Sequence, residues 1–281
     1  MYCKLPSEPQ TEITDRHVEQ YDQDGYTCLR GVFHQDWIDY MREAVGKAAA
    51  QPGPLAQVYT KPEDPGRSWG DHAMWERIPE LKNFILHSPA AAIAARLTGS
   101  PSVNLFYDHL IVKEPETQQR TPWHQDQPYW AVQGWQIITL WTPFDPVPAR
   151  NSLEVVRGTH RGETYNPFHF TTRQPFAGTG LPLIPDIEAN RQDYEIVAYD
   201  MEPGDCLILH ARMIHGAPGN NRSEARRRVL ITHWAGEDAR YKKMEGELAI
   251  NAKDPGLQDG DPLDGCPHYP RAWPPGTGAE A

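Results

Sequence analysis

The chain has 281 residues, of which 39% are hydrophobic, and its 38 acidic and 27 basic residues give a formal net charge of −11. This length is enough to bury a large core within one domain, and the negative charge argues against a protein that binds the phosphates of nucleic acid. The apolar runs are far shorter than the roughly 20 residues of a membrane span, so we expect neither a nucleic-acid nor a membrane partner.

The N-terminus and the cysteines indicate the cellular setting. Residues 1–9 lack a charged start followed by an apolar stretch, so no secretory signal is visible and a cytoplasmic protein is expected. The four cysteines, Cys3, Cys28, Cys206 and Cys266, form no Cys-x-x-Cys pair, which predicts free thiols rather than a zinc site or disulfides. The sequence leaves the oligomeric state open, a homo-oligomer included.

The first third of the chain, about residues 12–100, predicts helices that support the rest of the domain. Apolar side chains recur at helical spacing over residues 37–48. A further helix is predicted with Ser88 as N-cap, Pro89 at its first helical position and a stop at Gly99.

From about residue 101 to residue 240 the pattern changes to short apolar or alternating runs separated by Pro, Gly and Asn, which is typical of strands. No period of 20 to 50 residues repeats, which disfavours a solenoid or a propeller. We therefore expect one domain over residues 1–281, mainly β with flanking helices and with a double-stranded β-helix, a cupin-like jelly roll, as its core. Its predicted strands cover residues 103–112, 135–141, 153–156, 194–198, 206–210 and 229–234.

Two long irregular stretches, residues 53–70 and 165–190, have the length of binding loops or lids, and we assign them to substrate. The tail, residues 255–281, is rich in Pro, Gly and Asp and cannot bury much apolar surface on its own. It is either mobile or packed across the barrel.

The most informative segment covers residues 121–130. His124 and Asp126 lie two positions apart and would project from the same face of an extended segment. Such a pair alone is a weak signal, since a hydrogen-bonded structural histidine gives the same pattern. A second, distant histidine would complete the two-His-one-carboxylate triad, which binds iron(II) and leaves positions open for a chelating co-substrate and dioxygen. Of His210 and His215, we choose His215, which leads into a Gly-Ala-Pro-Gly turn.

The order and spacing of several runs resemble the phytanoyl-CoA dioxygenase family. The matching runs are residues 123–126, 151–160, 215–220 and 227–230, and the resemblance extends over residues 24–241. It implies that the catalytic iron ligands are His124, Asp126 and His215, that the metal is Fe(II), and that 2-oxoglutarate and dioxygen are co-substrates. The presence of Asp126 argues against halogenation, because halogenases of related design lack this carboxylate.

The resemblance also implies an arginine that binds the distal carboxylate of 2-oxoglutarate, and three consecutive arginines compete for this role. Counting from His215 favours Arg226, whereas the pattern Arg-x-Val-Leu favours Arg227, whose side chain would share a strand face with His233. On this pattern we choose Arg227. An arginine suits the role because its planar guanidinium can make two parallel hydrogen bonds to a carboxylate. Consecutive strand residues face opposite ways, so at least one of Arg226 and Arg228 is expected at the surface.

Two further strands are expected to contribute to the pocket. Trp141 occupies the family position where an aromatic side chain lines the 2-oxoglutarate pocket, and Thr139 lies on its face. A tryptophan of the core explains Trp141 equally well. Tyr107 and His109 share a face of the strand before the His-x-Asp motif, and one of them is expected to reach co-substrate or substrate.

Aromatic side chains suggest a cavity for an apolar or ring-containing small molecule. These residues are Tyr129, Trp130, Phe168, Phe170 and Trp234. The histidines without ligand-like spacing are expected to be structural. They include His160, His169 and His233.

The sequence thus predicts an Fe(II)- and 2-oxoglutarate-dependent dioxygenase that hydroxylates a C–H bond of a small organic molecule and releases succinate and CO2; desaturation, epimerisation and cyclisation stay open. One alternative is a cupin-like isomerase or hydrolase whose metal acts as a Lewis acid, which does not explain the arginine after His215. The other is a non-catalytic barrel that binds a small ligand, which does not explain three metal ligands. A Ser-His-Asp hydrolase is unsupported, because no Gly-x-Ser-x-Gly occurs.

Overall fold

The computed structural model describes residues 5–170, 172–221, 225–244 and 254–275. Cys3 and the last residues of the tail, 276–281, lie outside the described residues. No helix among the described residues is long and apolar enough to cross a membrane. Cys28, Cys206 and Cys266 are free thiols, as the sequence predicts.

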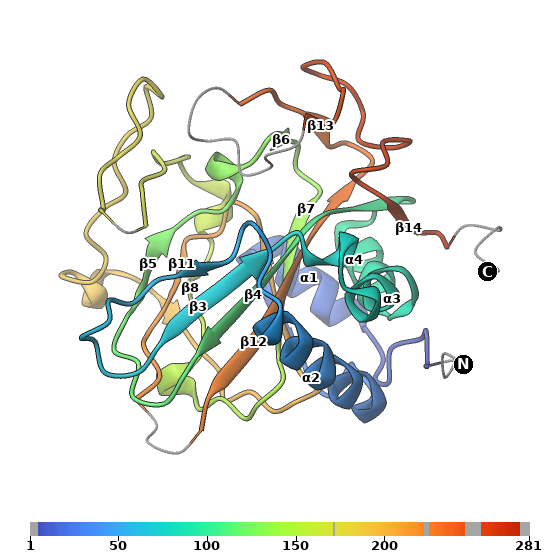
Figure 1. Cartoon of the computed structure of the whole chain (residues 1–281). Coiled ribbons are helices and arrows are strands. Elements are labelled where there is room, and N and C mark those ends of the chain that lie inside the picture. Colours follow the sequence, from blue (N-terminus) through green and yellow to red (C-terminus); the bar gives the residue numbers. More distant parts are fainter. Residues whose placement is uncertain (1–4, 171, 222–224, 245–253, 276–281) are drawn as a thin grey trace.

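Two antiparallel sheets form the body of the fold (Figure 1). The eight-stranded sheet has the order β1 (Tyr26–Leu29), β10 (Cys206–His210), β7 (Ile137–Pro143), β12 (Arg227–Gly236), β4 (Val103–Lys113), β3 (Ser68–His72) and β2 (Gln57–Val58), with β14 (Arg271–Trp273) also paired to β4. The four-stranded sheet has the order β5 (Thr121–His124), β11 (His215–Ala217), β8 (Glu154–Val156) and β9 (Ile196–Val197), and β13 (Arg240–Tyr241) pairs with β6 (Val132–Gln133). These sheets confirm the predicted jelly-roll class.

Four helices pack against one face of the large sheet (Figure 1). They are α1 (Asp15–Asp24), α2 (Gln35–Ala50), α3 (Pro79–His87) and α4 (Ala90–Thr98). Short 3-10 turns complete the fold at Met74–Glu76 (η1), Gln127–Tyr129 (η2), Ala149–Asn151 (η3), Thr159–Arg161 (η4) and Arg191–Asp193 (η5). Helix α1 ends at Gly25, whose φ of +81° favours glycine and where a Cβ would lie 2.4 Å from His160 Nδ1.

The prediction of supporting helices over residues 12–100 is only partly right, because this part of the chain also contains strands β1, β2 and β3. The other predicted elements differ from the observed ones mainly at their ends. Helix α2 contains the predicted helical spacing, and β10 has the predicted bounds. Helix α4 ends before Gly99 as predicted, but it begins at Ala90, so that Pro89 is the N-cap residue rather than the first helical residue. Ser88 still assists the start, because its Oγ accepts a hydrogen bond from the Ala90 N–H at 3.3 Å.

Strand β12 separates the helical core from a cavity between the two sheets. Its alternate side chains Arg227, Val229, Ile231 and His233 line the cavity. Leu230 belongs instead to the core cluster that the helices share with the outer face of the sheet. The two-residue period of a strand thus assigns each side chain of β12 to one of two environments.

Trp234 lies on the helix side of β12, which corrects its predicted place in a substrate cavity. Its side chain is fully buried in the helical core, and its indole N–H donates to Thr232 Oγ1 at 2.8 Å. It follows His233 directly, so it faces away from the cavity.

Trp234→Ala is therefore expected to lower the free energy of unfolding by about 3–5 kcal/mol, because it removes a large core side chain. Metal and 2-oxoglutarate binding by the folded variant should stay close to wild type. Urea unfolding measures the first quantity and anaerobic titration the second. A variant of wild-type stability that has lost ligand binding would contradict this placement.

The described part of the tail packs across the barrel, which decides between the two alternatives that the sequence left open. Strand β14 pairs with β4. Leu263, Cys266 and Tyr269 are buried in a cluster with Phe106 and Trp130. The tail therefore covers apolar surface at one end of the large sheet.

Candidate metal centre and cavity

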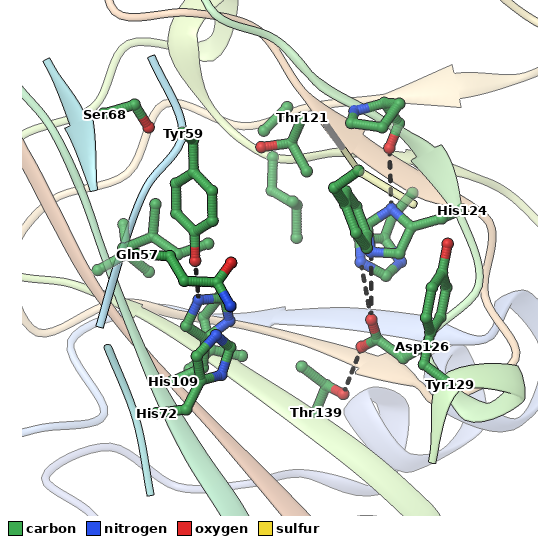
Figure 2. A pocket seen from close by; sticks show the side chains of 18 of the residues that line it. Gln57, Tyr59, Ser68, His72, His109, Thr121, His124, Asp126, Tyr129 and Thr139 are labelled. Carbon is green, nitrogen blue, oxygen red and sulfur yellow. Dashed lines mark hydrogen bonds and ion pairs between the residues drawn. The ribbon is translucent and has the colours of Figure 1, made fainter. Parts of the chain in front are cut away.

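A cavity of about 560 Å³ lies between the two sheets. Both long irregular stretches reach it, since Gln57 and Tyr59 line it from one stretch and Phe168, Phe170 and Phe176 from the other. Figure 2 shows the two sides of this cavity, with His124 and Asp126 on one and Tyr59, His72 and His109 on the other. Both stretches assigned to substrate thus border the cavity, although residues 53–70 are not irregular throughout, because they contain β2 and the start of β3.

Three buried side chains in this cavity form a group that could hold a metal ion. One ligand atom from each of His124, Asp126 and His215 lies within 4.8 Å of the others. Asp126 Oδ1 is 3.3 Å from His124 Nε2 and 3.5 Å from His215 Nε2. Strand pairing brings the two histidines together, because His215 on β11 is opposite His124 on β5. The structure therefore brings together the three ligands chosen from the sequence.

The backbone sets both imidazoles in the state that a metal requires. His124 Nδ1 lies 2.8 Å from the Pro122 carbonyl oxygen, and His215 Nδ1 lies 3.0 Å from the Met213 carbonyl oxygen. A carbonyl only accepts, so each Nδ1 carries a proton, and Nε2 is the nitrogen of each ring that faces the centre and can bind a metal. Burial lowers the pKa of His215 to about 4, which keeps this ring neutral at pH 7.

Asp126 supplies the negative charge of the group. Burial opposes its charged form, but the imidazoles of His215 and His124 outweigh this and hold its pKa below the usual value. Its second oxygen, Oδ2, accepts a hydrogen bond from the Thr139 hydroxyl at 3.2 Å. Two imidazoles and one carboxylate that line a cavity suit iron(II), with the cavity available for a chelating co-substrate.

Thr139→Val should weaken metal binding by about 10- to 100-fold, because it removes the hydroxyl that orients the Asp126 carboxylate. Thr142→Val is the matched control, since Thr142 is buried on the other face of β7 and contacts Cys206 Sγ at 3.5 Å. Equilibrium titration with Fe(II) under anaerobic conditions compares the two variants. Equal loss of affinity in both would contradict the role of Thr139.

Two buried cations, Arg227 and Lys113, line the same cavity. Burial lowers the pKa of Arg227 to about 10; burial, together with Arg227, holds that of Lys113 well below its usual value. Lys113 Nζ donates to the carbonyls of Gln119 at 2.8 Å and Pro218 at 3.1 Å, and Arg227 Nη1 donates to the Asn151 carbonyl.

Neither cation has a carboxylate partner among the described residues, and the buried Arg227 Nε has no hydrogen-bond partner there. A buried charge is ordinarily paired. This end of the cavity is therefore suited to an anion.

The side chains of the three consecutive arginines lie in different environments, as the alternation of side chains along a strand requires. The side chain of Arg226 is 55% exposed and pairs with Glu114, whereas Arg227 as a whole is only 4% exposed. Arg228 pairs with Asp145. Only Arg227 of the three lines the cavity, which is the arginine chosen from the sequence.

Most of the other predicted site residues also line this cavity, while His210 lies outside the metal group and packs on Trp135 with 4.4 Å between ring centroids. The lining residues among those predicted are Trp141, Thr139, His109, Tyr107, Tyr129, Trp130, Phe168 and Phe170.

Sequence reasoning missed several polar side chains of the cavity. His233 and His169 line it, although both were expected to be purely structural. Lys113 and His72 were not predicted as site residues at all. The alternation of side chains along β4 and β12 could have identified Lys113 and His233 as cavity residues. Lys113 shares a strand face with His109, and His233 shares one with Arg227.

Comparisons with known proteins agree with this geometry. The sequence profile of the family described as phytanoyl-CoA dioxygenase (PhyH) matches residues 21–229. The chain is 30% identical over 176 residues to a probable phytanoyl-CoA dioxygenase of Caenorhabditis elegans, covering 60% of this chain and 55% of that protein. It is 28% identical over 156 residues to the peroxisomal phytanoyl-CoA dioxygenase of Homo sapiens, covering 54% of this chain and 45% of that protein. The matches thus span about half the length of these relatives.

Among solved structures, the chain is similar to the non-heme alpha ketoglutarate dependent carbocyclase SnoK from nogalamycin biosynthesis. The TM-score is 0.73 at 22% identity, and the match covers 95% of this chain and 99% of that one. This likeness concerns the fold. Because the family profile matches well over half of the sequence, the chain belongs to the phytanoyl-CoA dioxygenase family.

Proposed function

We propose that the protein is an Fe(II)- and 2-oxoglutarate-dependent dioxygenase that hydroxylates a C–H bond of a small organic molecule. The reaction consumes 2-oxoglutarate and dioxygen, places one oxygen atom in the product alcohol and the other in succinate, and releases carbon dioxide. One observation carries the proposal: a buried His-Asp-His group and two buried cations without carboxylate partners, among the described residues, line one cavity.

The cavity's own residues divide the tasks. His124, Asp126 and His215 would hold the iron through Nε2, a carboxylate oxygen and Nε2. Arg227 and Lys113 would neutralise and orient the distal carboxylate of 2-oxoglutarate, and the unpaired Arg227 Nε is a ready donor for it. Bound iron and 2-oxoglutarate supply the activation of dioxygen and the oxidation of the C–H bond.

Aromatic side chains would keep water away from this chemistry. The ring of Phe170 stands edge-on to His124, with 4.9 Å between ring centroids. Tyr129 packs on Phe170 at 5.3 Å and its hydroxyl donates to the Phe168 carbonyl at 2.9 Å. This wall positions a substrate and limits side reactions.

Anaerobic titration of Fe(II) and then 2-oxoglutarate into the metal-free protein tests the proposal, with the visible charge-transfer band of the chelate as readout. A band that requires both additions, together with succinate release in air, is the expected result. Metal binding without the band would favour the Lewis-acid isomerase or hydrolase. Failure to bind either would favour the non-catalytic barrel.

A further inference from the structure

One buried hydrogen-bond chain in the cavity ends on an atom without a partner. Thr139 Oγ1 lies 3.2 Å from Asp126 Oδ2 and 2.9 Å from His233 Nδ1. The other ring nitrogen, His233 Nε2, is buried and has no hydrogen-bond partner among the described residues. His233 is 2% exposed and lines the cavity.

The direction of this chain follows from its first member. The Thr139 hydroxyl donates to the Asp126 carboxylate oxygen Oδ2, and this uses its single proton. Thr139 Oγ1 must then accept from His233, which places the ring proton on Nδ1. Burial lowers the pKa of His233 to about 3, so the ring carries one proton at pH 7 and Nε2 is an unused acceptor.

The neighbouring ring of Tyr107 carries a hydroxyl donor. The Trp130 indole N–H, which can only donate, donates to Tyr107 Oη at 3.0 Å. The Tyr107 hydroxyl proton has no acceptor among the described residues, and burial keeps its pKa well above the usual value. The rings of Tyr107 and His233 pack with 4.3 Å between their centroids. The two packed rings therefore carry, on residues that both line the cavity, one donor and one acceptor that the described residues leave unused.

Their positions along the strands place Tyr107 and His233 far from the end of the cavity that holds Arg227 and Lys113. His233 lies six residues along β12 from Arg227, which is roughly 20 Å between their backbones. His233 pairs across the sheet with Thr139, the residue that contacts Asp126. A 2-oxoglutarate molecule directed from the metal toward Arg227 would leave the His233 side free for the substrate.

We infer that His233 Nε2 and Tyr107 Oη bind a hydroxyl group of the substrate, which donates to the imidazole and accepts from the phenol. This inference rests on the proposed function and names its substrate class: an alcohol on a ring skeleton, whose apolar part contacts the aromatic wall of Tyr129, Phe168 and Phe170. Both residues position the substrate. Leaving the acceptor or the donor unmatched would weaken binding, since an unsatisfied buried polar group is costly.

The first test measures the proton position on His233 and needs no substrate. In metal-free protein with ¹⁵N-labelled histidine, the ring of His233, identified as the signal lost in His233→Asn, should carry its proton on Nδ1. Thr139→Val should shift that proton toward Nε2, because it removes the acceptor, and Tyr107→Phe should not. A wild-type ring protonated on Nε2 would overturn the inference.

The second test uses cyclohexanol, 1-indanol and 1-tetralol, each beside its methyl ether, with alcohol-dependent succinate release and calorimetric binding as readouts. At least one alcohol should bind to the wild type about tenfold more tightly than its methyl ether does. This difference is the size of one buried hydrogen bond. The preference should fall below about twofold in His233→Asn, whose shorter amide can still donate to Thr139 but offers no acceptor at the Nε2 position.

The two tests separate this inference from the proposed function. The substrate class would be overturned if no alcohol binds more tightly than its methyl ether. It would also be overturned if His233→Asn keeps the wild-type preference for the alcohol. If the chelate band is absent from the wild type, the proposed function fails, whereas the ¹⁵N measurement and calorimetric binding to the metal-free protein still decide the role of His233.

Discussion

Asp126→Ala is expected to abolish succinate release and to weaken Fe(II) binding by more than about 100-fold, because loss of a group that only supports a ligand already costs about 10- to 100-fold. The substitution removes one of the three ligand atoms and the only negative charge of the group. Two imidazoles would then hold the cation alone. Anaerobic titration with Fe(II), followed by the chelate band, measures the loss.

Asp145→Ala is the matched control for Asp126→Ala. Asp145 is similarly buried but pairs with Arg228 outside the cavity, so its loss should affect stability and leave Fe(II) affinity unchanged. Circular dichroism establishes that both variants fold. An Asp126→Ala protein that binds Fe(II) as tightly as the wild type would remove the basis of the proposed metal centre.

Arg227→Met should raise the dissociation constant of 2-oxoglutarate by on the order of 100-fold, about 3 kcal/mol, since it removes a buried charge-assisted donor pair. Arg227→Lys should restore little of this, because an ammonium cannot reproduce the guanidinium fork. Titration of the chelate band in the iron-loaded protein gives the affinity. Arg226→Met, at an exposed neighbour, should stay within about twofold of wild type.

Arg227→Met is expected to lose affinity for 2-oxoglutarate without losing stability. Arg227 is a buried cation without a carboxylate partner among the described residues, so the ligand-free fold bears the cost of its burial. Replacing it by methionine should therefore leave the free energy of unfolding unchanged or raise it. A variant that loses 2-oxoglutarate affinity only because it is less stable would contradict the anion site.

The sequence-based predictions were most accurate where neighbouring residues alone determine the feature, and less accurate where the pairing of distant strands determines it. His124 and Asp126 were recognisable because two positions on an extended segment share a face. His215 was chosen from the turn that follows it and supported by the family resemblance, and Arg227 needed that resemblance, since nothing local in the sequence says that β11 pairs with β5 or that an arginine faces the cavity. Trp234 was placed wrongly because aromatic character alone does not distinguish the two faces of a strand.

By itself the sequence determined the class of the fold and the pairing of His124 with Asp126 as candidate metal ligands, because both depend on a short period or on spacing along the chain. Only the tertiary structure decided that Lys113 lies beside Arg227, that the tail covers the barrel, and that Thr139 links Asp126 to His233. These relations join residues from different strands, where strand register and burial determine which polar atoms find partners. The unpaired Nε2 of His233 is a property of the assembled cavity, and no local pattern in the sequence encodes it.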